Sequence, residues 1–130
     1  MKKPEKKIYE NQEEVHDKIV GFLKNRVNKI DCEVYLVGSS TTRQFGKYVE
    51  KFGDHDGSDI DAVVMVKEKD IPKDWKYLEV KKDWFRLYRG GKININGTIH
   101  KADFMVVKPS LEKMAHQRMK ELKWIVEKLK

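Results

Sequence analysis

The feature that most constrains the fold is a run of five apolar residues, Ala62–Val66, which directly follows the segment Gly57–Asp61. A valine-rich run of this length is typical of a strand that is buried on both faces. The glycine, the serine and the two aspartates in front of it have the composition of a loop end. The sequence therefore predicts a strand at residues 59–66, with Asp59 and Asp61 at its start.

The chain before this strand contains a helical pattern, a short apolar run and a capping signal. Apolar residues at helical spacing indicate the helix, and threonines are good N-cap residues. The predicted elements are a helix at residues 10–30, a strand at Glu33–Val37, a second helix from Thr41 and Thr42 toward Phe52, and a loop at residues 53–58.

The chain after it has mainly the pattern of antiparallel strands. Asn96-Gly97 is the strongest hairpin signal, because both residues tolerate positive φ. The predicted elements are a strand at 84–88, a turn at 89–91, a strand at 92–95, the hairpin, a strand at 98–107 that contains Asp103, and a helix at 110–129. Together, the two halves predict one α+β domain over residues 1–130, with a mixed β-sheet and helices packed on one side.

Length and cysteine content limit the class of protein. A chain of 130 residues suits one domain with a single core. Cys32 is the only cysteine, which excludes a disulfide framework and a cysteine-based zinc site and favours the cytoplasm as the location. No apolar run is long enough to span a bilayer, and the N-terminal residues lack the apolar stretch of a signal peptide, so we expect no membrane association.

Charge is distributed unevenly along the chain, whose formal net charge is +7. Residues 31–66 carry 3 basic and 7 acidic groups, which gives −4. The three flanking segments, at residues 1–30, 67–107 and 108–130, carry +3, +4 and +4. Such a chain would attract polyanions to its outer surface and hold cations at one place, although a merely soluble basic surface explains the same numbers.

The aspartate pair suggests a cation site. Residues i and i+2 of a strand point to the same face, so Asp59 and Asp61 would project together. Two close carboxylates ionise reluctantly unless a cation lies between them. Mg²⁺ usually takes one or two protein carboxylates and completes its shell with water and substrate phosphates. The alternative interpretation is a solvated strand end.

Gly38-Ser39, at the end of the first predicted strand, suggests a phosphate site. A glycine lets a phosphate approach the backbone, and the free N–H groups at a helix N-terminus favour anions. A phosphate site beside a carboxylate pair implies a nucleoside triphosphate with its Mg²⁺. Ser40 and Arg43 follow in the same segment and complete the predicted nucleotide-binding set.

In this order and on these elements, the residues resemble the DNA polymerase beta-like nucleotidyltransferase superfamily, which includes CCA-adding enzymes and poly(A) polymerases. The resemblance covers residues 33–107 and implies a third carboxylate on a later strand, which matches Asp103 in HKADFMVV. It also implies that Asp59, Asp61 and Asp103 hold two Mg²⁺ ions, or Mn²⁺ ions, and are the catalytic residues. Two features depart from the family pattern: 19 residues separate Ser39 from Asp59, and Thr42 stands where a basic residue is common.

The acidic loop, His55, Asp103 and the aromatic stretch also fit other interpretations. The segment from Asp54 to Asp59 resembles a calcium loop of the Asp-x-Asp-x-Asp type, but position 12 of that loop would be Met65 instead of glutamate. His55 could be a ligand, a general base or a solvated loop residue, and Asp103 could pair with Lys101 or His100. Basic residues alternate with aromatic ones between residues 75 and 89, which suits single-stranded nucleic acid or a nucleobase, although core packing is the more common role of such aromatics.

The sequence thus leads to one main hypothesis and two alternatives. The main hypothesis is a Mg²⁺-dependent nucleotidyltransferase that moves a nucleoside monophosphate from an NTP such as ATP to an acceptor hydroxyl and releases pyrophosphate. The first alternative is a weakly active or inactive binding module of the same fold, with a helical protein partner or a second copy of the chain. The second is a basic RNA-binding domain. The acceptor, whether RNA, protein or small molecule, stays open.

Overall fold

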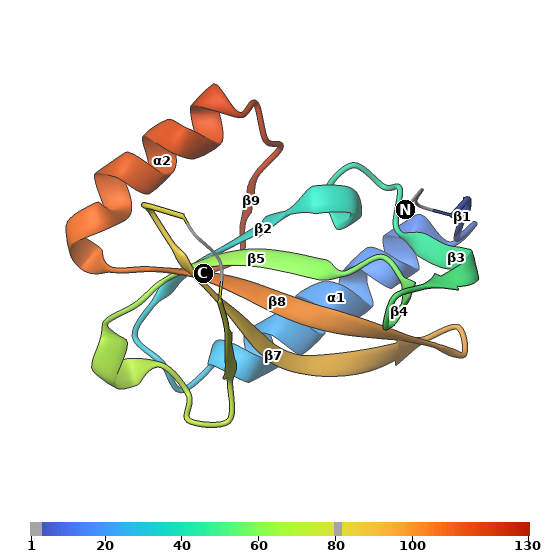
Figure 1. Cartoon of the computed structure of the whole chain (residues 1–130), viewed down its shortest axis with the longest axis horizontal. Helices are drawn as coiled ribbons and strands as arrows, with labels where there is room; N and C mark the ends of the chain where they lie inside the picture. Colours follow the sequence, from blue (N-terminus) through green and yellow to red (C-terminus); the bar gives the residue numbers. More distant parts are fainter. Residues whose placement is uncertain (1–3, 80–81) are drawn as a thin grey trace.

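A computed structural model describes residues 4–79 and 82–130, which form two β-sheets and two α-helices (Figure 1). The elements, in chain order, are β1 (Lys6–Ile8), α1 (Gln12–Val27), β2 (Glu33–Val37), β3 (Gly46–Phe52), β4 (His55–Gly57), β5 (Ile60–Met65), β6 (Lys76–Leu78), β7 (Arg86–Ile95), β8 (Thr98–Val107), α2 (Glu112–Glu121) and β9 (Glu127–Lys128). The larger sheet has the order β6-β7-β8-β5-β2-β9, and the smaller has the order β1-β3-β4. Because β5 pairs with β8 in parallel while the other pairs are antiparallel, the predicted α+β class with a mixed sheet is confirmed.

The central strand β5 is buried on both faces, as its apolar run predicts. Ala62 and Val64 belong to one core cluster, which also contains the apolar stripe of α1. Val63 and Met65 belong to a second cluster, which contains Ala115 and other residues of α2. The two helices therefore cover opposite faces of the sheet, with α1 behind it in Figure 1, and the expectation of helices on one side does not hold for α2.

The predicted helix between Thr41 and Phe52 is wrong. Gly38–Ser40 form a single 3₁₀ turn, and Arg43 then takes a left-handed conformation with φ of 60°. A left-handed residue cannot continue a right-handed helix. The chain proceeds into β3, where buried and exposed residues alternate from Gly46 to Val49 with the period of a strand. The predicted loop at 53–58 contains β4, which pairs with β3.

The predicted turn at Arg89-Gly90-Gly91 is also wrong, because β7 runs through it as one continuous strand. The pairing of β7 with β8 shifts register between Arg89 and Lys92, which is the signature of a β-bulge. Gly91 has φ of +116°, and a Cβ on Gly90 would lie only 2.2 Å from the ring of Phe104. Both glycines are therefore required by the bulge and by the close approach of the core.

The last predicted helix, at 110–129, is correct only in its first part. α2 ends at Glu121, and Lys123 adopts a positive φ of 58° while the N–H of Trp124 donates to the Met119 carbonyl. The chain then reverses and pairs with β2 as β9. Residues 122–126 consequently run beside the edge of the large sheet instead of extending away from it. Among the described residues, no helix combines the length and the apolar character needed to cross a membrane.

His100 on β8 is fully buried and gives the fold a dependence on pH. Its Nδ1 donates to the Ser58 carbonyl at 2.7 Å, and its Nε2 accepts from the Tyr9 hydroxyl at 2.8 Å. Burial lowers the pKa of His100 below the ordinary value of 6.5. The unfolded chain therefore binds a proton at mildly acidic pH that the folded chain does not bind.

We expect the free energy of unfolding to fall as the pH drops through 6.5, the value for the unfolded histidine, with a slope from this residue of at most about 1.4 kcal/mol per pH unit. Denaturant titrations from about pH 7.5 to about pH 5.5 measure this slope. The variant His100→Gln should have a flatter profile, whereas the exposed control His116→Gln should keep the wild-type slope. Equal slopes for all three proteins would contradict the assignment.

Candidate functional site

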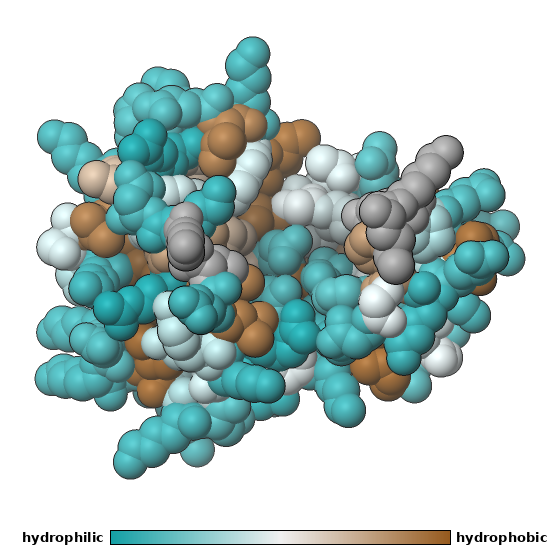
Figure 2. All heavy atoms as spheres, in the orientation of Figure 1, coloured by the Kyte–Doolittle hydropathy of each residue, from teal (hydrophilic) through white to brown (hydrophobic). Residues whose placement is uncertain are grey.

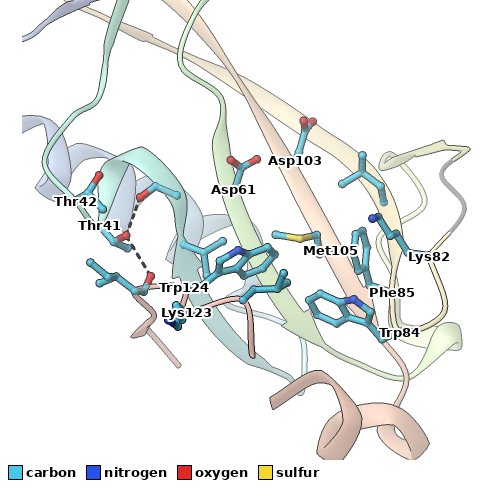
Figure 3. Close-up of a pocket in the computed structure, with 15 residues that line it drawn as sticks. Thr41, Thr42, Asp61, Lys82, Trp84, Phe85, Asp103, Met105, Lys123 and Trp124 are labelled. Carbon is cyan, nitrogen blue, oxygen red and sulfur yellow. Dashed lines mark hydrogen bonds between the residues drawn. The ribbon is translucent and has the colours of Figure 1, made fainter. Parts of the chain in front are cut away.

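Two of the predicted site carboxylates stand side by side on the central strands of the large sheet. In the parallel pairing of β5 with β8, Asp61 is the direct partner of Asp103. Paired residues on neighbouring strands are about 5 Å apart and project from the same face. Figure 3 shows both carboxylates at the same end of that face. Residues 42 positions apart in the sequence are thus brought together by strand pairing.

Asp59 lies one residue before β5 and is half-buried. Its Oδ1 is 3.0 Å from Nδ1 of His55 on β4. Burial raises the pKa of Asp59, and the negative charge of Asp103 raises it further, while His55 acts in the opposite direction. The charge of Asp103 is therefore close enough to act on Asp59, and the three predicted carboxylates occupy one end of the sheet.

Asp103 is mostly buried, and its carboxylate is held by an arginine. Arg89 is its direct partner across the β7–β8 pairing, and Nε of Arg89 donates to Oδ1 at 2.9 Å while Nη2 donates to Oδ2 at 3.4 Å. This hydrogen bond raises the pKa of Arg89 above its ordinary value. Such a two-pronged pair is among the stronger ionic contacts in proteins. The contact of Arg89 with Asp103 is not predicted from the sequence, in which Arg89, followed by two glycines, has the pattern of a turn.

A further carboxylate, that of Asp54, lies near the end of the sheet that carries Asp59, Asp61 and Asp103 (the acidic end), and two cations contact it. Lys101 lies 2.7 Å from Asp54, and Arg89 lies 3.9 Å from the same carboxylate. Arg89 thus stands between Asp54 and Asp103 and partly neutralises both. The bulge after Arg89 sets this position, since it fixes the register of the strand that carries the arginine.

In the described part of the chain, no group of three or more His, Cys, Asp or Glu side chains is arranged to hold a metal ion. The Asp59 carboxylate faces His55, and the Asp103 carboxylate faces Arg89. The donor set itself fits Mg²⁺, which prefers carboxylate oxygens.

Gly38 ends β2 and lies directly against the carboxylate of Asp61. Its φ is +84°, and a Cβ built on it would be 3.1 Å from Oδ2 of Asp61. The next residues form a tight turn, in which the Thr41 hydroxyl donates to the Gly38 carbonyl at 2.7 Å and the Thr42 hydroxyl donates to the Ser39 carbonyl at 3.2 Å. The predicted proximity of the Gly-Ser turn to the aspartates is therefore present, on a turn instead of a helix N-terminus.

The substitution Gly38→Ala should lower the free energy of unfolding by about 2 kcal/mol. About half of this loss comes from the left-handed backbone, which an L-residue adopts at a cost of about 1–2 kcal/mol. The remainder comes from the displaced Asp61 carboxylate. Gly97→Ala is the matched control, because Gly97 has nearly the same φ of +86° and open space where the Cβ would be. Equal losses in the two variants, measured by denaturant unfolding, would mean that the contact with Asp61 contributes nothing.

The other members of the predicted nucleotide-binding set lie farther from the acidic end. Arg43 points toward α1, where its Nε donates to Glu13 at 2.6 Å. Its Nη1 donates to the Ser40 carbonyl in its own turn. The Ser40 hydroxyl is buried and donates to the Val37 carbonyl at 3.5 Å. Of the four predicted residues, Gly38 alone contributes to the pocket described next.

A pocket of about 650 Å³ opens from the acidic end of the sheet toward α2. Its floor is the face of the sheet that carries Asp61, Asp103 and Met105, as Figure 3 shows. One wall comes from the segment before β7 and the other from the segment after α2. The residues of these walls are Lys82, Trp84 and Phe85 on one side and Leu122, Lys123, Trp124 and Ile125 on the other.

Sequence analysis found one of these walls in part and missed the other. Trp84 and Phe85 belong to the stretch of alternating basic and aromatic residues, which was consistent with a nucleobase site although core packing was the preferred explanation. Both explanations are partly correct, because Trp84 packs in the second core cluster and also lines the pocket. Trp124 was missed because the last helix was expected to continue past it. The positive φ of Lys123 has no signal in the sequence.

The chain resembles known proteins only distantly. No protein-family description matches the chain, and no curated protein matches it. Two solved structures show a distant likeness, a mutant of the Cid1 poly(U) polymerase bound to MgATP, with a TM-score of 0.46, and the Cid1 poly(U) polymerase bound to MgGTP, with a TM-score of 0.43. Each is 14% identical and matches 78% of this chain, and the match covers 34% of the polymerase chain. A likeness at this level carries no argument about activity.

Proposed function

We propose that this chain is a Mg²⁺-dependent nucleotidyltransferase domain that moves a nucleoside monophosphate from an NTP to an acceptor hydroxyl. The observation that carries the proposal is the pairing of Asp61 with Asp103 on parallel strands, with Gly38 against the Asp61 carboxylate. A backbone without a Cβ beside clustered carboxylates suits a phosphate chain that must lie close to a metal site. The sequence motif and the strand register support this function independently.

The residues have distinct roles in this proposal. Asp59, Asp61 and Asp103 would hold Mg²⁺, which when bound neutralises the triphosphate and favours loss of the acceptor proton. The turn at Gly38 and Ser39 would hold the β- and γ-phosphates, with Ser40 supporting that turn from inside. In the transfer, the acceptor oxygen bonds to the α-phosphorus while the bond to the leaving pyrophosphate breaks, and the hydroxyl proton passes to solvent.

The contacts of Asp103 and Asp59 also favour a second candidate, a binding module with little or no transfer. Arg89 forms an ion pair with Asp103, and His55 contacts Asp59 at 3.0 Å. A chain that used its acidic residues only to fasten its strands would contain the same ion pairs. In that case, the pocket would serve a ligand or a protein partner, such as a helical protein or a second copy of this chain.

A transfer assay separates the two candidates. The purified chain is incubated with each of the four α-³²P-labelled NTPs, Mg²⁺ or Mn²⁺, and cell extracts that contain RNA and protein. We expect label to appear in RNA or in protein only when the divalent ion is present, and the labelled fraction identifies the acceptor. Binding of NTPs without any metal-dependent label would favour the binding module.

A further inference from the structure

We propose that the pocket beside the acidic end of the sheet receives the nucleobase of the nucleotide, which stacks on Phe85 and Trp124, and that it accepts purines better than pyrimidines. This inference rests on the proposed function for the position of the phosphates. It assigns a binding role to residues outside the Gly38-Ser39 turn and the three aspartates. It also assigns the class of nucleotide.

The position of the pocket relative to the acidic residues supports a nucleotide as its occupant. The same cavity is lined by Gly38, Asp61 and Asp103 at one end and by aromatic side chains at the other (Figure 3). A molecule with a charged metal-binding group at one end and a flat apolar group at the other matches both ends at once. The volume of about 650 Å³ lies within the range of small-molecule sites.

The aromatic end is a preformed cluster. Trp84 is 4% exposed, and its ring packs edge-on against Phe85 at a centroid distance of 4.6 Å and in a tilted arrangement against Trp124 at 5.8 Å. Phe85 and Trp124 are only half-buried and line the cavity. Because Trp84 holds the other two rings in place, their free surfaces are available to a base at little entropic cost. Bases stack on such surfaces irrespective of their identity, since every base has a π-face.

The apolar surface of the pocket is not fully covered by the protein itself. Leu122 is 52% exposed and Ile125 is 60% exposed, and both line the wall that carries Trp124. Figure 2 shows apolar surface gathered in this region, near the segment that follows α2, among hydrophilic surroundings. The Thr41 hydroxyl fastens this wall to the turn of Gly38, because it donates to the Ile125 carbonyl at 3.2 Å as well as to that of Gly38.

The polar groups at the aromatic end explain the expected preference for purines. Among the described residues, the polar side chains near the rings are the ammonium groups of Lys82 and Lys123 and the Thr41 hydroxyl, which is already engaged with the Gly38 and Ile125 carbonyls. Lysine ammonium groups are flexible donors that fix no particular base edge. Recognition therefore depends on the area of the ring that is stacked, which is larger for a purine. The two lysines also add positive charge to the pocket, which favours an anionic nucleotide over a neutral ligand.

The test compares equilibrium binding of ATP, GTP, UTP and inorganic tripolyphosphate, each with Mg²⁺, by calorimetry. We expect ATP and GTP to bind at least about 10-fold more tightly than tripolyphosphate, with UTP between them. Trp124→Leu, which keeps an apolar side chain but removes the ring, should remove most of the advantage of ATP and leave the affinity for tripolyphosphate unchanged. Trp124→Phe keeps a ring and should retain most of the advantage.

Tyr77→Ala is the matched control, since Tyr77 is a half-exposed aromatic residue on β6 that does not line the pocket. It should leave all four affinities unchanged, and thermal unfolding verifies that each variant is folded. Equal binding of ATP and tripolyphosphate by the wild type, no loss in Trp124→Leu, or tighter binding of UTP overturns the inference even if transfer occurs. Binding that depends on Trp124 without any transfer supports the inference and refutes the proposed enzyme activity.

Discussion

Asp103→Asn should reduce nucleotide transfer by on the order of 1,000-fold, about 4 kcal/mol, while Mg²⁺–NTP still binds within roughly tenfold of the wild-type affinity. Asp61→Asn should lose transfer to a similar degree and also weaken Mg²⁺–NTP binding. The two substitutions remove the same charge from paired positions on neighbouring strands. A difference in nucleotide binding between them therefore reports a difference in role.

The surroundings of each aspartate give the reason for this difference. Asp61 lies against Gly38, at the turn proposed for the phosphates, so in the proposed site its charge would serve the metal that accompanies the triphosphate. Asp103 is on the far side of Asp61 from that turn, beside β7, where we expect the acceptor to approach. Loss of its charge removes activation of the acceptor hydroxyl and leaves the triphosphate contacts in place.

Calorimetric titration of an NTP into each variant, together with the transfer assay, measures the two effects. Asp74→Asn is the control, because Asp74 is an exposed aspartate that pairs with Arg26 at 3.5 Å outside the site. It should bind and transfer as the wild type does. Full transfer by Asp103→Asn would show that Asp103 is not the third carboxylate, and equal loss of NTP binding in both site variants would contradict the separate roles.

The strands that carry the aspartates could be predicted because their signals are local. The apolar run after Asp61 and the hairpin signal at Asn96-Gly97 each depend on a few neighbouring residues, and both are confirmed. The parallel pairing that joins Asp61 to Asp103 is not local, since β7 and β8 are neighbours in sequence while β5 and β8 are not. A known family pattern suggested this contact, and spacing in the sequence alone does not contain it.

The two failed helix predictions share a physical cause. Thr41 and Thr42 have the side chains of N-cap residues, but they cap a single turn because Arg43 takes a left-handed conformation. Lys123 ends the last helix in the same way. An arginine or a lysine with positive φ carries no sequence signature of the kind that Asn96-Gly97 has, because tertiary contacts impose the conformation. The errors therefore fall at two segments that line the pocket, where local preference gives way to the arrangement of the site.

Arg89→Gln should lower the free energy of unfolding by about 2 kcal/mol in metal-free buffer, and saturating Mg²⁺ should restore most of it. Removal of one partner from a buried ion pair costs about 3–5 kcal/mol, because the other charge stays buried without compensation. A quarter of the Arg89 side chain is exposed, so water reduces this cost to the value above. The expected change in melting temperature is roughly 8 °C for a domain of this size.

The response to Mg²⁺ is what distinguishes a metal site from a structural ion pair. In the wild type, Mg²⁺ must displace Arg89 from Asp103, so added ion should change the melting temperature little. In Arg89→Gln, the ion meets no competing arginine at Asp103 and stabilises the folded state by its full binding free energy, about 2.7 kcal/mol at a hundred times its dissociation constant.

Thermal unfolding across a Mg²⁺ titration measures both proteins. Arg86→Gln is the control, because Arg86 lies on the same strand as Arg89 but pairs with the exposed Glu68. The melting temperature of this variant should not respond to Mg²⁺. If Arg89→Gln is destabilised and Mg²⁺ gives it nothing back, Asp103 serves only to fasten β7 to β8, and the binding module becomes the better description of the chain.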